Sequence, residues 1–463
     1  MVIQEASIED GSTMPIQRRQ KELHWGWLFL LSFPVATFAL VEKCSGTALT
    51  FTLKKYIQNP AWILFLGSIN SLFAVIIAPW AAYKSDQVQT FLGRRKTMIT
   101  AGFLLLILSM VLIPHASSVI LLVFLILIYQ FAVDLGYTGP WNPLYFDVVP
   151  KKQRGRGMII NRYASIAARF VFMFFLIGQF DEEISFKKAS AALSESRWAV
   201  LTGEQVIYYL TAILLFLSLL IILIFVKEKQ CIHEKKETVT LWKYLQQMFL
   251  VRHNFLLCIL VISSVLMSTQ LMNLRPLLIT EQFGYSKKMF GNIHGITMLF
   301  NTILILPLLV FLIDRVDKFK LFTCCILLST LQPAVFWCYV KYLAPSGIPS
   351  ASAIIAFTVA DSIFDRTGLL VLWPFLFDQV DPEKKGFMNS GFLLAAGCVK
   401  FLNTNLMGLW VQFVHVLSGK SGQIDYMSCY IYIFIVGIIG CIGTLLFAKY
   451  RKSWNCPSYI DQM

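Results

Sequence analysis

Long apolar segments separated by short polar ones run along almost the whole chain. A helix needs about 20 mostly apolar residues to cross a bilayer, so each long segment is a candidate membrane span. Turn-forming residues such as Asn59-Pro60 and Pro114-His115 separate neighbouring segments. The pattern predicts an all-α integral membrane protein with twelve transmembrane helices, of which the third is short. The predicted spans are Leu28–Phe51, Trp62–Tyr83, Thr97–Ile113, Val119–Asn142, Met158–Phe180, Val206–Val226, Phe255–Thr280, Met289–Ile313, Leu321–Leu343, Ala351–Phe377, Phe387–His415 and Tyr430–Ala448.

A long polar segment interrupts this pattern near the middle of the chain. Residues 227–252 are rich in charge, and within them Leu241–Leu245 has the pattern of an amphipathic helix lying on the membrane surface. We therefore expect a cytoplasmic N-terminal tail (1–24), a six-helix bundle (25–226), a cytoplasmic linker (227–252), a second six-helix bundle (253–449) and a cytoplasmic C-terminal tail (450–463). A second polar insert, residues 181–204, follows the fifth span, and the sequence suggests no function for it.

Composition agrees with a membrane protein. The chain is 57% hydrophobic and only 14% charged, whereas a soluble protein carries about 25% charged residues. The loops on the side of both termini hold 25 Lys and Arg residues and the opposite loops hold 9. By the positive-inside rule, both termini are cytoplasmic and the protein lies in an inner or plasma membrane. This bias and attraction to anionic lipid account for the net charge of +14 without a nucleic-acid partner.

Two stretches of the chain match each other at a constant offset of 231 residues, the separation of Asp134 and Asp365. Internal repeats with a site at their interface are typical of secondary transporters. The repeat predicts two pseudo-symmetric bundles, each with a polar centre. The other matching positions are Pro143 and Pro374, Phe146 and Phe377, Asp147 and Asp378, Val149 and Val380, Gly155 and Gly386, and Arg169 and Lys400.

Charged residues inside the predicted helices are candidates for a coupling site, because burying a charge in hydrocarbon is expensive. With about 1.5 Å per residue, Asp134 and Arg169 both lie roughly 20 Å from the inner boundary, on consecutive helices. We expect them to pair, and Asp365 and Lys400 lie level with each other in the second half. The Asp134–Arg169 pair is either a permanent structural pair or a switchable one, in which a proton on Asp134 releases Arg169.

Other charges interrupt the apolar helices. Glu42 and Lys43 lie in the first span, and neighbours on a helix point about 100° apart, so we expect them not to face one cavity together. Glu42 is a further coupling candidate. Arg275 precedes Pro276, where a helix can bend, and either binds substrate or caps the helix. Arg366 follows Asp365 and offers that carboxylate a second neutralising charge.

Aromatic and amide side chains accompany these charges. Tyr137, Trp141 and Asn142 lie in the fourth span and Trp373 in the tenth. Flat rings with nearby amides suit a sugar, whose faces are apolar and whose edges form hydrogen bonds. The alternative is packing or a membrane-interface belt, because aromatic residues make up 14% of the chain.

The most specific motif is the loop Ser85–Lys96, in which Asp86 precedes Gly93, Arg94 and Arg95. A tight turn needs the glycine, and an acid beside guanidinium groups can form ion pairs that break and reform. This loop resembles the 2–3 loop of the major facilitator superfamily. The six residues between Asp86 and Gly93 are similar to the glycoside–pentoside–hexuronide and sucrose–proton symporters. Gly139-Pro140, Leu144 and Asp147 also resemble the end of helix 4 in the sucrose group.

The resemblance covers the whole chain in topology, and at motif level about Trp80–Lys96 and Gly139–Gly157. It implies that the loop residues form a cytoplasmic charge lock in an outward-facing state and do not bind substrate. Sodium-coupled members of the sugar family carry acids in helix 2, whereas Trp62–Tyr83 has none, which favours protons. The expected lock is Asp86, Gly93, Arg94, Arg95, Asp147 and Arg154, with weaker copies at Asp314 and Asp378.

The sequence lacks a GxxxxGK[ST] phosphate loop and any convincing metal motif. We therefore expect no enzymatic activity, no cofactor and no metal. The first hypothesis is a monomeric carrier, with helices 1, 4, 7 and 10 around a central cavity, that imports a sugar or glycoside by proton symport and alternating access. One alternative is a proton-coupled exporter of amphipathic molecules. Another is a non-transporting receptor on the same fold, because fold does not fix function.

Overall fold

We analysed a computed structural model of the chain. The structure describes residues 24–87, 90, 92–150, 153–185, 200–226, 250–268, 271, 274–305, 316–380, 385–418 and 424–453. The predicted surface helix Leu241–Leu245 and the gate residue Asp314 lie outside these residues. So do the side chains of Asp86, Arg94 and Asn142.

The first six predicted spans form an N-terminal bundle of helices. Between the fifth and the sixth, strands β1 (Glu183–Ser185) and β2 (Val200–Thr202) pair antiparallel, with Glu183 opposite Thr202. The helical elements are, span by span, α1 (Trp25–Lys43), η1 (Cys44–Ala48) and α2 (Leu49–Tyr56); α3 (Pro60–Gln87); α4 (Arg94–Leu112) and η2 (Ile113–His115); α5 (Val119–Val133), η3 (Asp134–Thr138) and α6 (Trp141–Val148); α7 (Arg154–Val171), η5 (Phe172–Leu176) and η6 (Ile177–Gln179); and α8 (Gly203–Phe225).

The remaining helices form a C-terminal bundle. Its last helix continues through Ser453, and so includes the start of the segment predicted as the C-terminal tail. The elements are α10 (Arg252–Met267), α11 (Arg275–Leu277) and η10 (Leu278–Gln282); α12 (Lys287–Phe300) and η11 (Asn301–Ile305); α14 (Lys318–Cys338), η12 (Tyr339–Leu343) and η13 (Pro345–Gly347); α15 (Ala351–Asp378); α16 (Lys385–Ser418); and α17 (Ser428–Ser453).

Local sequence explains where several helices begin. Ser118, Ser286 and Ser350 each stand at an N-cap and accept a hydrogen bond from a backbone N–H in the first turn. Such caps satisfy donors that have no partner within the helix. Thr202 forms a complete capping box with Gln205 at the start of α8.

Nine of the helices that the structure describes are long and apolar enough to cross a membrane by length and composition alone. The other predicted spans fall short for identifiable reasons. Helix α10 has 16 residues, and α12 has 14 before the chain passes through η11 to residues outside the description. Helix α15 is 28 residues long but carries Asp361, Asp365 and Arg366 within its apolar sequence. The predicted all-α, multi-pass architecture is confirmed.

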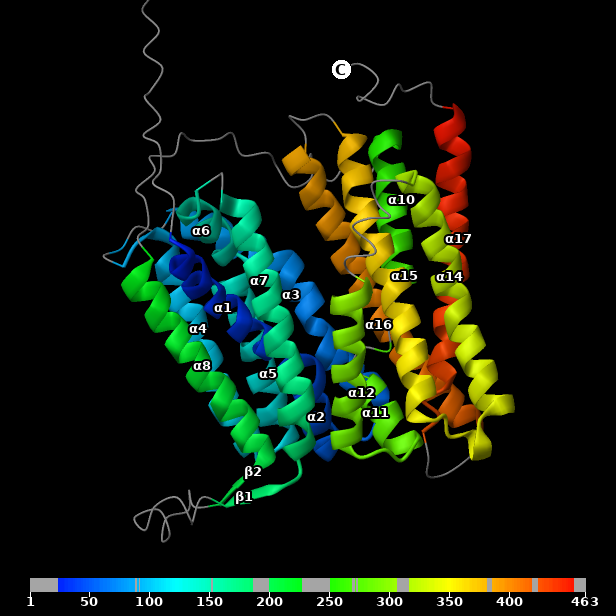
Figure 1. Cartoon of the computed structure of the whole chain (residues 1–463), viewed down its shortest axis with the longest axis horizontal. Coiled ribbons are helices and arrows are strands. Elements are labelled where there is room, and N and C mark those ends of the chain that lie inside the picture. Colours follow the sequence, from blue (N-terminus) through cyan, green and yellow to red (C-terminus); the bar gives the residue numbers. More distant parts are fainter. Residues whose placement is uncertain are drawn as a thin grey trace, which may run out of the picture.

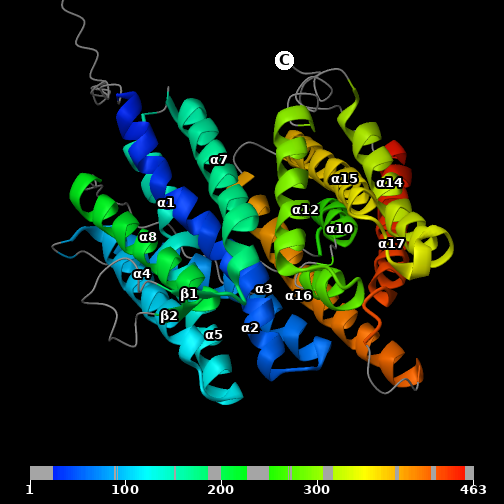
Figure 2. The same cartoon turned by 60° about the horizontal axis from the view of Figure 1, so that its bottom comes forward.

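The two bundles stand side by side (Figure 1). Helices α3 and α16 pack along each other across the boundary, and α12 packs against η5 and η6. The view in Figure 2 shows α7 of the N-terminal bundle facing α12 of the C-terminal one. The boundary between the bundles is therefore built from the second, fifth, eighth and eleventh spans.

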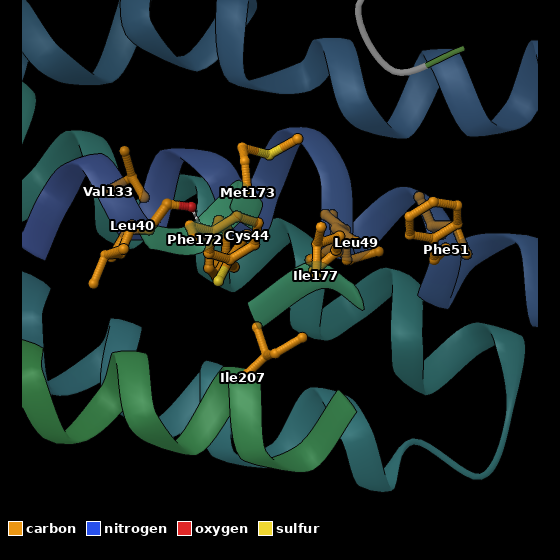
Figure 3. Close-up of a cluster of buried hydrophobic side chains, with 14 of the residues drawn as sticks. Leu40, Cys44, Leu49, Phe51, Val133, Phe172, Met173, Ile177 and Ile207 are labelled. Atoms are coloured by element: carbon orange, nitrogen blue, oxygen red, sulfur yellow. Dashed lines mark hydrogen bonds between the residues drawn. The ribbon is translucent and has the colours of Figure 1, made fainter. Parts of the chain in front are cut away.

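The cores of the bundles are apolar and tightly packed. In Figure 3, Leu40, Cys44 and Leu49 of the first span meet Phe172 and Ile177 of the fifth. Many large apolar side chains on the outer surface are exposed instead, such as Ile120 at 82%. Apolar exposure of this extent suits a surface that faces lipid and not water.

Candidate functional site

A cavity of about 390 Å³ lies between the two bundles. Residues of the first, second and fifth spans line it from one side, and residues of the seventh, eighth, tenth and eleventh from the other. Its charged lining residues are Glu42, Lys43, Arg169, Arg275, Arg366 and Lys400. Hydroxyl and amide groups also line it, among them Ser68, Asn70, Asn301, Ser362 and Thr404. A polar cavity at the interface of two repeats is where a carrier binds its solute.

Arg169 pairs with Glu42 on the wall of this cavity. The Arg169 Nη2 atom donates to Glu42 Oε2 at 2.5 Å, and the Glu42 side chain remains 54% exposed. The pair joins α7 to α1, which pack along each other. The predicted Asp134–Arg169 pair is therefore wrong. Arg169 does face a polar centre, but its partner comes from the first span and not from the fourth.

Asp134 is fully buried in the N-terminal bundle, and it is not among the residues that line the cavity. It begins η3, which packs against α3 and α4. Within the described residues, neither carboxylate oxygen meets strict hydrogen-bond geometry, although the Thr138 side chain acts on the carboxylate, and no basic side chain forms an ion pair with it. Equal depth did not bring Asp134 to Arg169, because depth sets the height of a residue but not the direction in which its side chain points.

The backbones of the third and fourth spans meet beside Asp134. A Cβ atom added at Gly102 would lie 2.4 Å from the Cα of Gly136, and one at Gly136 would lie 3.0 Å from the Cα of Gly102. Only residues without side chains allow helices to approach this closely. This contact fixes η3 against α4 and holds the Asp134 carboxyl inside the bundle.

Glu42 and Lys43 both line the cavity, which contradicts the expectation that neighbours on a helix cannot face one site. The cavity spans several helices, and the four-carbon side chain of Lys43 can turn its ammonium group toward it. The positive charges of Arg169 and Arg275 both act on Lys43. The sequence did not identify Lys43 as a site residue, because the direction of its side chain was judged from helical geometry alone.

In the C-terminal bundle, Arg275 pairs with Asp361. The Arg275 Nη2 atom lies 3.2 Å from Asp361 Oδ2, and both side chains are mostly buried, at 16% and 15% exposed. Arg275 opens the short helix α11 just before Pro276. Asp361 was not identified from the sequence, although it stands one helical turn before Asp365 inside an apolar span and an intramembrane acid is a functional candidate.

Arg366 and Lys400 line the same cavity from α15 and α16. Lys400 and Asp365 are close enough for their charges to act on each other, as their predicted common depth implied. Arg366 is subject to the charge of Asp365 on its own helix and to that of Arg169 on the opposite bundle. The cavity therefore gathers basic groups from both halves.

The aromatic candidates do not line this cavity. Tyr137 stacks on Phe38 with ring centroids 3.4 Å apart, and Trp141, only 2% exposed, stacks on Tyr137. Trp373 packs near Phe392. The packing interpretation fits these positions. Of the expected ring of helices 1, 4, 7 and 10, the first, seventh and tenth spans line this cavity, whereas its described lining includes no residue of the fourth span.

Comparison with known proteins places this geometry in a familiar architecture. No protein-family model matches the chain, and no curated protein does. Among solved structures, a mutant form of the nucleoside transporter NupG matches with a TM-score of 0.68 and 13% identity over 91% of this chain and 99% of that one. The chain has the major facilitator fold.

Two further solved structures agree. A bacterial homolog of the human lysosomal transporter Spinster, in an inward-facing and occupied conformation, matches with a TM-score of 0.65 and 13% identity over 93% of this chain and 97% of that one. A POT family transporter in complex with a thioalcohol-conjugated peptide matches with a TM-score of 0.65 and 12% identity over 92% and 96%. At such identities the likeness establishes the fold, and it does not distinguish a sugar-symporter branch.

The loop motif of the major facilitator fold is partly visible. Arg95 forms an ion pair with Asp147, which links the third and fourth spans. Gly93 has a φ of 115°, a conformation that favours glycine. Arg154 donates to the backbone oxygens of Phe146 and Val149, at 2.6 and 3.3 Å, and so closes the end of α6.

The second half repeats this arrangement. Lys318 Nζ lies 2.7 Å from Asp378 Oδ2, which links α14 to α15 as Arg95 links α4 to α6. Both pairs stay within one bundle. In the part of the chain that the structure describes, no ion pair joins the two bundles on the side of the termini.

On the opposite side, ion pairs and hydrogen bonds do join the bundles. Lys54 Nζ lies 3.1 Å from Glu281 Oε2, and the hydroxyl of Tyr426 donates to the same carboxylate oxygen at 3.0 Å. Burial and the Glu281 carboxylate raise the pKa of Tyr426, which keeps its proton for this bond. We call Lys54, Glu281 and Tyr426 the closure cluster. No sequence pattern indicated this cluster, because its members lie 145 or more residues apart in the chain.

No metal centre is apparent in the described ranges, where no group of three or more His, Cys, Asp or Glu side chains could hold an ion. His294 lines the cavity alone, in edge contact with Phe290 at a ring-centroid distance of 4.6 Å.

Proposed function

We propose that the protein is a secondary active transporter that moves a small polar solute through the central cavity by alternating access, in symport with protons. The observation that carries this proposal is the Arg169–Glu42 pair, which faces a cavity lined by both bundles. Carriers of this fold rock their halves around a central site. Solved transporters with the same fold support a transport function.

We further propose Glu42 as the coupling carboxylate in place of Asp134. Glu42 is held by Arg169 and reaches the cavity, so a solute and a proton can both compete for this pair. A proton on Glu42 weakens its hold on Arg169, and a solute that binds Arg169 frees Glu42 to accept a proton. Asp134 lacks both the cavity and the partner that such competition requires.

The alternatives from the sequence have less support. Export of amphipathic molecules would favour an aromatic, apolar cavity, whereas six charged side chains line this one. A non-transporting receptor would agree with the unpaired, buried Asp134, but it does not explain charges that both bundles direct toward one cavity. The hydroxyl and amide groups of the lining suit a sugar or another hydroxylated solute.

The direct test uses purified protein in liposomes with a labelled panel of neutral sugars, sugar acids and sugar phosphates. An acidic exterior should drive accumulation of one solute class and acidify the lumen, reported by a trapped pH dye. Counterflow without a pH gradient should persist, because exchange needs only alternating access. Accumulation that ignores the pH gradient would contradict proton coupling, and absence of counterflow for every solute in the panel would contradict transport of these classes.

We also propose that both termini face the cytoplasm and that the protein acts as a monomer in the cell membrane. In this arrangement, residues 227–252 form a linker between the bundle 25–226 and the bundle 253–449. The loop charges motivate the orientation. A membrane-impermeant thiol reagent applied from outside should label a cysteine at exposed Ser346 and not one at exposed Thr90. The reverse pattern would overturn the orientation, and a dimer in native-membrane cross-linking would overturn the monomer.

A further inference from the structure

The charges that line the central cavity are strongly unequal. Within the described residues its lining contains five basic side chains and one acidic one. Lys43 and Arg169 come from the N-terminal bundle, and Arg275, Arg366 and Lys400 come from the C-terminal bundle. A neutral solute would need hydroxyl and amide groups, which the lining already supplies. The excess of positive charge therefore requires its own explanation.

Ion pairs balance only part of this excess. Glu42 balances Arg169, and Asp361 balances Arg275. Lys43, Arg366 and Lys400 form no ion pair within 4 Å among the described residues. Glu42 and Asp365 both act on Lys400, and Asp365 also acts on Arg366, so Asp365 can offset one of the three charges beyond the Glu42–Arg169 pair. Among the described residues, the five basic side chains of the lining therefore exceed the three acids Glu42, Asp361 and Asp365 by two charges.

The unbalanced charges also oppose one another across the boundary between the bundles. Arg366 acts on Lys43, and Arg162 and Arg169 act on Arg366. Like charges between two apolar bundles repel more strongly than in bulk water, because the effective dielectric constant there is lower. If the bundles close over the cavity on the side of the termini, these groups approach further, and closure with an empty site is unfavourable. An anion between them would remove this repulsion.

We propose that the solute is a small organic anion with at least two negative charges, held between Lys43 and Arg169 on one bundle and Arg366 and Lys400 on the other. This rests on the proposed function, in which the central cavity is the transport site. Guanidinium groups bind carboxylate and phosphate through paired hydrogen bonds, so both arginines suit either acid. A doubly charged solute reaches both halves and makes their closure favourable.

Binding of this anion also explains coupling. One acidic group of the solute competes with Glu42 for Arg169, and the displaced Glu42 carboxylate, now without its cation, takes up a proton. No bond to carbon forms or breaks; one proton moves from water to Glu42. The solute and the proton then cross together.

Binding measurements on the purified full-length protein test this class. Calorimetry and thermal shift would compare glucose, gluconate, glucarate, glucose 6-phosphate and succinate at low and high salt. We expect glucarate, glucose 6-phosphate or succinate to bind at least tenfold more tightly than glucose, with affinity that falls as salt rises. A comparison of glucarate and succinate with glucose 6-phosphate shows whether the site recognises carboxylate or phosphate groups. Equal binding of glucose and the dianions, or binding of none of the dianions, overturns the proposal.

Substitutions locate the anion. Arg366→Gln and Lys400→Gln should each weaken dianion binding at least tenfold, whereas Arg366→Lys and Lys400→Arg should retain part of it. Lys320→Gln is the matched control, because Lys320 is exposed at the start of α14 and should bind as the wild type does. Ligand-free melting temperature reports whether each variant folds. If Arg366→Lys and Lys400→Arg fold, and neither Arg366→Gln nor Lys400→Gln lowers the affinity for the dianion, the anion does not bind between these residues.

Counterflow separates this inference from the proposed function. A dianion that binds tightly but shows no counterflow leaves the anion site standing and contradicts transport of that dianion. A neutral sugar that shows counterflow, while no dianion binds, supports transport and overturns the anion.

Discussion

Arg169 and Glu42 stand 127 residues apart in the chain and form an ion pair at the boundary between the bundles. Their contact converts two intramembrane charges, each costly alone, into a pair that faces a polar cavity. Because basic side chains outnumber acids in the described lining of the cavity, this pair is the point at which a bound anion and a proton can influence each other.

Glu42→Gln should uncouple transport from protons. The substitution leaves Arg169 without its carboxylate, so an anionic solute meets no competitor and binds equally well or more tightly. Accumulation driven by an acidic exterior should fall at least tenfold, while counterflow remains within about threefold of wild type, because alternating access does not need the proton. Liposome uptake of the labelled solute, with and without the pH gradient, measures both. Unchanged accumulation in Glu42→Gln would show that the coupling group lies elsewhere.

Asp134→Asn should leave transport largely intact. The side chain is buried in the N-terminal bundle, away from the lining of the cavity, and Asn has the same shape without the ionisable group. We expect at least half of wild-type accumulation and an unchanged pH dependence in the same uptake assay. Loss of uphill accumulation, with folding and counterflow preserved, would restore Asp134 as the coupling residue and contradict the role given to Glu42.

Gly102→Ala should destabilise the N-terminal bundle. The added methyl group would lie 2.4 Å from the backbone of Gly136, which cannot move without separating η3 from α4. We expect a loss of about 1–3 kcal/mol, the usual cost of overpacking. Thermal unfolding in detergent measures it. Gly155→Ala is the matched control, because a methyl group there meets nothing within 4 Å, and a comparable loss in both variants would show that the helix contact is not the cause.

Glu281→Gln should loosen the closure cluster. It removes the carboxylate that Lys54 and Tyr426 share across the bundles. Spin labels at exposed positions Gln58 and Ser346, in a background without cysteine, should report a longer or broader distance on the side opposite the termini. Lys341→Gln on the same side, outside the cluster, should leave the distance distribution unchanged. A distribution identical to wild type in Glu281→Gln would mean that packing alone keeps this side closed.

The resemblance of the Ser85–Lys96 loop to the superfamily agrees with the observed fold, and Arg95 and Asp147 do pair. The pair joins helices of the same bundle, so in this conformation it braces the N-terminal half. Asp378 and Lys318 brace the other half in the corresponding place. The repeat in the sequence was thus a sound guide to related positions, even where it did not reveal their partners.

The sequence by itself determined the class and the internal symmetry of this protein. The length of each apolar segment predicts a span, the polar segment 227–252 predicts a division into two groups of six, and the offset of 231 residues relates Asp134 to Asp365. These features depend only on local composition and on the thickness of a bilayer. The depth of a charge within a helix follows in the same way from the rise per residue.

Only the tertiary structure decided which charges meet. The rotation of each helix about its axis depends on contacts such as Gly102 with Gly136, and the π-helical turns η1, η3 and η5 change the face that later residues present. Arg169 therefore met Glu42 and not Asp134, and Asp361 emerged as the partner of Arg275. Side-chain direction is set by packing among helices that are distant in sequence, and no local pattern encodes it.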